Sequence, residues 1–71
     1  MAKYAVATIN FYDNDLKIEF VEASDLRDAI IRSSFCKDFT EEDFLLLPDT
    51  LEEIKGLAFD QDAMIDVKEI T

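Results

Sequence analysis

The sequence predicts a small α+β domain of ββααβ order, in which a three-stranded sheet carries helices on one face. Three observations support this class. Residues 3–12 and 16–21 alternate like a β-hairpin, apolar residues recur at helical spacing over 24–58, and residues 63–70 are typical of a third strand. With 71 residues, the chain has room for one domain, residues 1–71, built around one core.

The hairpin is predicted from two alternating segments around Asp13, Asn14 and Asp15, a composition that suits a tight turn. In each segment one face is consistently apolar, and we assign that face to the core. Its members are Ala5, Ala7, Ile9 and Phe11 in the first segment, and Leu16, Ile18 and Phe20 in the second.

A first helix is expected over residues 24–36, with Ser24 as its N-cap and Asp28 and Arg32 as an i,i+4 ion pair. The expected helix is the longest of the chain, and the two that follow are short.

Thr40 opens the next helix through a capping box with Asp43, and Phe39 and Phe44 occupy the positions of a hydrophobic staple. Pro48 ends this helix because it disfavours helical geometry at the preceding residue.

A third helix begins after Asp49 or Thr50, with Glu52 or Glu53 at N3 accordingly, and Gly56 marks its C-terminal end or a weak point near that end. In the third strand, Ile65 and Val67 share the core face, while the pairing and direction of the strand stay open. The residues expected to be mostly buried are Ile9, Phe11, Ile18, Phe20, Leu26, Ile30, Leu51, Ile54 and Val67.

Negative charge is concentrated in the second half of the chain. Seventeen acids against seven bases give a net charge of −10, of which residues 38–71 contribute −9. Such a charge field repels nucleic acid and anionic membrane and attracts basic surfaces. The candidate partner-binding residues are Glu41, Glu42, Asp43, Asp49, Glu52, Glu53, Asp60 and Asp62.

Composition argues against an enzyme. The chain has no His and one Gly, so neither the commonest general base nor a phosphate-cradling loop is present. Asp60-Gln61-Asp62 and Asp13-Asn14-Asp15 lack the later ligands and the glycine of a calcium loop, and we expect no metal or cofactor.

Cellular location is predicted from the lone Cys36 and from the apolar segments. A single thiol forms no internal disulfide and indicates a reducing compartment, and we expect it to be a buried small hydrophobe rather than a reactive group. Without a signal-peptide h-region or a membrane span, the sequence predicts a cytoplasmic protein.

Two functions are therefore expected. The first is a non-enzymatic acidic protein that inhibits or modulates a basic, nucleic-acid-binding protein. Its eleven carboxylates after residue 37 match the charge of about 19 Å of duplex. In size, acidity and lack of catalytic residues, the chain resembles small phage-encoded inhibitors of host nucleic-acid machinery, which implies nucleic-acid mimicry. The alternative is a structural or assembly subunit that forms a homo-oligomer through exposed aromatics, with acidity serving solubility.

Overall fold

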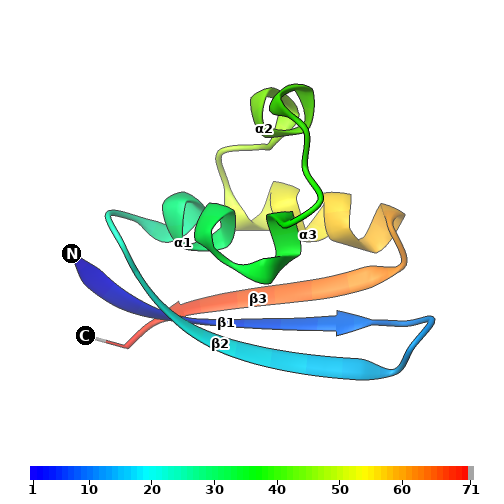
Figure 1. Ribbon diagram of the computed structural model, residues 1–71, viewed down its shortest axis with the longest axis horizontal. Helices are drawn as coiled ribbons and strands as arrows, with labels where there is room; N and C mark the ends of the chain where they lie inside the picture. Colours follow the sequence, from blue (N-terminus) through cyan, green and yellow to red (C-terminus); the bar gives the residue numbers. More distant parts are fainter. Residues whose placement is uncertain (71) are drawn as a thin grey trace.

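A three-stranded antiparallel sheet forms the base of the molecule in the computed structural model, which describes residues 1–70. Its strands are β1 (Ala2–Asn10), β2 (Asp15–Ala23) and β3 (Ala63–Glu69), arranged in the order β2-β1-β3 (Figure 1). β3 therefore pairs with β1 and runs antiparallel to it, which answers the question that the sequence left open.

The hairpin between β1 and β2 is confirmed, and its connection spans residues 11–14. Asn14 adopts a φ of 50°, the left-handed conformation that asparagine tolerates well. The amide of Phe11 donates a 3.0 Å hydrogen bond to the Asp62 carbonyl, so this connection is tied to the turn that precedes β3.

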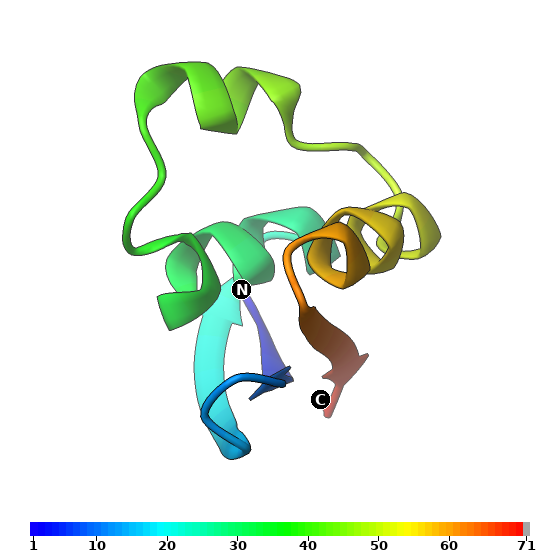
Figure 2. The ribbon, with the colours of Figure 1, turned by 90° about the vertical axis from the view of Figure 1, so that its right-hand side faces the viewer.

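All helices lie on the same side of the sheet (Figures 1 and 2). They are α1 (Leu26–Arg32), the 3-10 turn η1 (Ser34–Cys36), α2 (Glu41–Leu46) and α3 (Leu51–Asp60). α1 and α3 pack directly on the sheet, and α2 stands furthest from it (Figure 1). The α+β class, the ββααβ order and the coverage of one face agree with the sequence prediction.

The first helix differs from the prediction at both ends. Asp25, not Ser24, is the N-cap and accepts from the Asp28 amide at 2.8 Å, while Ser24 itself donates to the Asp28 carboxylate. The helix stops at Arg32, because the backbone of Ser33 is extended and its hydroxyl donates to the Ile30 carbonyl at 2.6 Å. α3, with ten residues, is consequently longer than α1.

Local capping chemistry fixes the two following helices as predicted. Thr40 and Asp43 form the reciprocal capping box of α2, and the rings of Phe39 and Phe44 lie 5.4 Å apart. Leu47 is extended before Pro48, and Thr50 caps α3 by accepting from the Glu53 amide. Gly56 does not end this helix, which continues to Asp60.

The core lies between the helices and one face of the sheet. Val6, Ile30 and Ile54 are the largest fully buried side chains, and the sheet also contributes Tyr4, Ala23, Ile65 and Val67 to the core. Of the nine expected core residues, Ile30, Ile54 and Val67 are buried, and Ile9, Leu26 and Leu51 are intermediate.

The core assignment of the hairpin is wrong. Phe11, Ile18 and Phe20 are exposed, because the helices cover the face of β1 that carries Tyr4 and Val6. The pairing of β1 with β3 explains why the helices cover this face. Its buried pair, Ile65 and Val67, lies opposite Thr8 and Val6 of β1, so only that face is apolar across β1 and β3 together. The apolar face that the sequence pattern identified in the hairpin points the other way.

Candidate functional site

The sheet face opposite the helices carries Leu16, Ile18, Phe20 and Met64, which are exposed, and we call it the open face. Its strand register places Ala5 opposite Phe20, Ala7 opposite Ile18, and Ile9 opposite Leu16. Met64 of β3 lies opposite Ile9 on the other side and extends the same row. Because residues directly opposite in an antiparallel pair share a face, these seven residues form one continuous apolar sheet surface. No helix covers it in residues 1–70 (Figures 1 and 2).

Large side chains on and beside the open face are strongly exposed. Their exposed fractions are 58% for Leu16, 57% for Ile18, 73% for Phe20, 53% for Met64, 42% for Phe11 and 65% for Phe59. Taking about 200 Å² for one fully exposed large side chain, these fractions amount to roughly 700 Å². The largest apolar patch of a typical monomer is about 300–600 Å², and a standard interface takes about 800 Å² from each partner. The open face is thus large enough to serve as a protein interface.

The side chains of the open face differ in size from one strand to the next. Ala5 and Ala7 leave a shallow trough along β1, beside a ridge formed by Leu16, Ile18 and Phe20 on β2. Toward the β3 edge, the face continues into a groove of about 430 Å³ that reaches Gly56 and Phe59 of α3. The Phe59 ring meets Phe11 edge-on, at a centroid distance of 6.4 Å. The apolar surface therefore extends around the sheet edge.

The charges on the open face are balanced. Lys3 lies opposite Glu22 at one end, and β3 adds Asp66 and Lys68, so the four strand charges sum to zero. Lys55 of α3 forms a 3.4 Å ion pair with Asp66 at the edge. In a protein of net charge −10, this face carries almost none of the excess.

The eight candidate carboxylates lie elsewhere, and we call them the acidic set. All are exposed: Glu41, Glu42 and Asp43 in the first turn of α2, Asp49 between α2 and α3, Glu52 and Glu53 in the first turn of α3, and Asp60 and Asp62 around its C-terminal end. Ten helical residues span about 15 Å, so α3 separates its two acidic groups by roughly that length. The structure thus gathers carboxylates at three helix ends.

Several members of the acidic set have a local role in the fold. Asp43 closes the capping box by accepting from the Thr40 amide at 2.9 Å, and the Glu53 carboxylate accepts from the Thr50 hydroxyl at 2.9 Å. Carboxylates in a first helical turn also stabilise the positive end of the helix dipole. Capping therefore accounts for part of this acidity independently of any partner.

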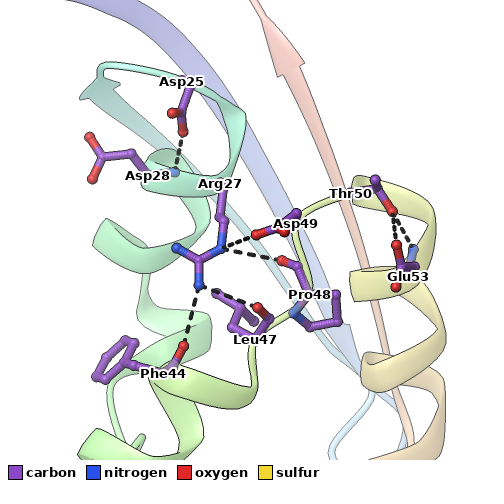
Figure 3. Close-up of polar contacts among 9 residues, drawn as sticks. All are labelled: Asp25, Arg27, Asp28, Phe44, Leu47, Pro48, Asp49, Thr50 and Glu53. Carbon is purple, nitrogen blue, oxygen red and sulfur yellow. Dashed lines mark hydrogen bonds and ion pairs between the residues drawn. The ribbon is translucent and has the colours of Figure 1, made fainter.

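Arg27 joins α1 to the segment between α2 and α3, an arrangement that the sequence did not reveal (Figure 3). Its guanidinium donates to the backbone carbonyls of Phe44, Leu47 and Pro48, each at 3.3 Å, and lies 3.6 Å from the Asp49 carboxylate. Two of these carbonyls belong to the C-terminal end of α2, which a cation stabilises. Asp49 is therefore positioned by an intramolecular ion pair. No local motif around Arg27 signals this contact.

Nucleophilic and metal-binding chemistry has little support in residues 1–70. Cys36 is buried, and burial raises the pKa of its thiol to about 11 even though the Arg27 charge opposes the shift. The thiol is therefore protonated at neutral pH and unsuited to attack. The described residues contain no group of three or more His, Cys, Asp or Glu side chains that could hold a metal ion.

A second hollow, of about 360 Å³, lies between the hairpin connection and η1. Its charged lining mixes Lys17 and Lys37 with Asp13, Asp15 and Asp38. Because both signs of charge are present, this hollow selects neither an anion nor a cation. No helix of residues 1–70 is long and apolar enough to cross a membrane.

Comparisons with protein-family models, with curated proteins and with solved structures gave no match to this chain. A function for this chain is therefore proposed from its own geometry. The sequence did single out the residues of the open face, because their alternation is clear, but it assigned them to the core. Whether these residues are buried or exposed is decided by β3, because its buried residues Ile65 and Val67 lie on the opposite face of the sheet.

Proposed function

We propose that this chain is a non-enzymatic protein-binding module whose binding surface is the open face of its sheet. One observation carries the proposal: the open face, together with Phe11 and Phe59 beside it, exposes roughly 700 Å² of apolar side chain, by the same estimate of about 200 Å² per side chain, and its strand charges sum to zero. Covering it with a partner removes that apolar surface from water, which is the main driving force of protein association.

The exposed side chains of β2 do not contribute to the helix-covered core. Tyr4, Val6, Ala23, Ile65 and Val67 supply the buried surface of the sheet, whereas Phe20 lies on the opposite face and is 73% exposed. A ridge of three large apolar residues on an edge strand increases the risk of aggregation unless it has a partner. Its presence therefore favours an association role over a purely solvent-facing one.

A second candidate function uses the acidic set. All eight of its carboxylates are exposed, and within residues 1–70 the ion pairs include only Asp49 from this set. On this hypothesis the helical side binds a basic protein, such as a nucleic-acid-binding protein, and inhibits or modulates it by nucleic-acid mimicry. A phage origin and a cytoplasmic location belong to the same hypothesis.

A capture experiment in cells that carry this gene separates the two functions. Tagged wild type is compared with an open-face variant, Ile18→Gln with Phe20→Gln, and with an acidic variant, Glu42→Lys with Glu52→Lys and Glu53→Lys. An untagged copy is co-expressed so that self-association is counted. Captured proteins are identified by mass spectrometry and purified, and their affinities for the three baits are then measured.

The open-face function predicts that the open-face variant loses the partner and that the acidic variant keeps it. The reverse pattern supports the acidic function, and its association rate should then fall steeply as salt rises. A partner bound equally well by both variants, or no partner at all, contradicts both proposals.

A further inference from the structure

We infer that the partner of the open face is a second copy of this chain, packed sheet against sheet in a two-fold dimer. This inference rests on the proposed function and adds the identity of the partner. Its basis is that the open face is complementary to itself in shape and in charge.

Shape complementarity follows from the register of β1 and β2. The trough of Ala5 and Ala7 runs parallel to the ridge that includes Ile18 and Phe20, and neighbouring strands lie about 4.8 Å apart. A two-fold axis between these strands and parallel to them would exchange their positions across the interface. The ridge of each copy would then lie over the trough of the other, with Ile18 above Ala7 of the second copy. Packed sheets of this kind lie about 10 Å apart.

Charge complementarity removes the main objection to self-association, which is the net charge of −10. The strand charges of the open face are Lys3, Glu22, Asp66 and Lys68, two of each sign. The acidic set lies on the helices, their ends and the turn before β3. A face-to-face dimer therefore directs most of its carboxylates outward, away from the shared interface.

The available area is sufficient for a dimer. The large side chains of the open face, Leu16, Ile18, Phe20 and Met64, expose roughly 480 Å² per copy, or roughly 700 Å² with Phe11 and Phe59 beside the face, against the about 800 Å² that each partner contributes to a standard interface. A lipid surface fits less well, because the acidic field repels anionic headgroups. The second exposed apolar site, Leu45 and Leu46 of α2, lies on a six-residue helix and offers far less area.

Sedimentation equilibrium of the full chain between about 1 µM and about 500 µM tests the inference, since interfaces of this size commonly bind at micromolar affinity or tighter. Three variants are compared with wild type. Ile18→Glu places a charge on the ridge, Ala7→Phe fills the trough, and Leu45→Glu adds the same charge to α2 as a matched control. Ile18, Ala7 and Leu45 lie outside the buried core, and circular dichroism verifies that each variant is folded.

Wild type is expected to be dimeric, and Ile18→Glu should weaken dimerisation at least about 30-fold, the size of a hot-spot loss. Ala7→Phe should also weaken it, although it adds apolar area, because the ridge no longer fits. Leu45→Glu should stay within about threefold of wild type because the mutated side chain lies far from the face. Raising the salt from about 0.05 M to about 0.5 M should strengthen dimerisation, since it screens repulsion between two acidic copies.

Several results would overturn the inference. They are a wild type that stays monomeric throughout, dimerisation that survives Ile18→Glu, dimerisation that is lost in Leu45→Glu, or dimerisation that Ala7→Phe strengthens. The last result would indicate non-specific apolar association. A monomeric wild type that binds another protein through the open face refutes the second copy and leaves the proposed function standing. A monomer without such a partner refutes both.

Discussion

Ile18 of β2 lies directly opposite Ala7 of β1, on the sheet face that no helix covers in residues 1–70. On the other face, Val6 lies opposite Glu19 of β2 and opposite Val67 of β3. The central strand thus carries apolar residues on both sides. β2 places Leu16, Ile18 and Phe20 on the open side, and on the helical side it carries Lys17 and Glu19 as well as Val21 and Ala23. Glu19 has a structural role there, because its carboxylate accepts from the backbone amide and the hydroxyl of Ser34.

Truncations on the two sides of the sheet should differ in their effect on stability. Ile30→Ala removes a fully buried side chain and should lower the free energy of unfolding by about 2–5 kcal/mol. Ile18→Thr keeps a β-branched residue on the exposed side and should stay within about 0.5 kcal/mol of wild type in dilute monomer. Urea unfolding at low protein concentration measures both. Equal losses for the two variants would contradict the assignment of the faces.

The α2 cap predicts a smaller, local effect. Thr40→Ala removes the acceptor of the Asp43 amide and should destabilise by about 1 kcal/mol. Hydrogen exchange at the Asp43 amide, together with urea unfolding, measures the loss. Thr40→Ser retains the hydroxyl and is the control. If the serine and alanine variants exchange alike, the capping box does not stabilise α2.

Removing the guanidinium of Arg27 should loosen the segment between α2 and α3. Arg27→Lys keeps the charge but cannot reach the same three carbonyls, and we expect a loss of about 1–3 kcal/mol. Arg32→Lys is the matched control, since Arg32 forms a surface ion pair with Asp28 and should cost under about 1 kcal/mol. The two unfolding free energies, measured in the same buffer, make the comparison. A larger loss at Arg32 would show that the carbonyl contacts contribute little.

Asp28 should make part of the stability dependent on pH. Hydrogen bonding from the Ser24 amide, assisted by Arg32, lowers the pKa of its carboxyl below 3.8 despite some desolvation. A group whose pKa is lowered on folding stabilises the fold above its unfolded pKa, and this contribution is lost as the pH falls through the folded pKa.

Asp28→Asn cannot ionise, so the stability difference between wild type and this variant should be constant from neutral pH to about 5 and shrink below about 4. Urea unfolding across this range measures the difference. A difference that does not change with pH would mean that the Asp28 carboxylate is not stabilised by folding.

Local sequence signals predicted where helices and strands form better than they predicted which face of the sheet is buried. The Thr40–Asp43 box, the Phe39–Phe44 contact and the stop at Pro48 involve neighbours in sequence, so short-range chemistry decides them. At Ser24 and Asp25 two capping residues are adjacent, and it is Asp25 whose side chain accepts from the Asp28 amide. Gly56 shows that one glycine can be tolerated within a helix.

The orientation of the hairpin needed non-local information. Both faces of β1 carry apolar or small residues, so its own pattern does not say which one the helices cover. Only the pairing with β3 decides, since Ile65 and Val67 must share a face with Val6. Arg27 illustrates the same limit, because its carbonyl acceptors lie 17–21 residues away in sequence.

Accessibility of an introduced thiol tests the central claim most directly. Phe20→Cys and Val6→Cys place a cysteine on the open and the helical face, respectively, while buried Cys36 serves as an internal slow reference. Alkylation is followed at a protein concentration well below the dimer dissociation constant measured by sedimentation, so that the chain is monomeric. We predict that the thiol of Phe20→Cys reacts like a free cysteine and that those of Val6→Cys and Cys36 react at least about 100-fold more slowly, because they require local opening. A thiol at position 20 that reacts as slowly as one at position 6 would contradict the account.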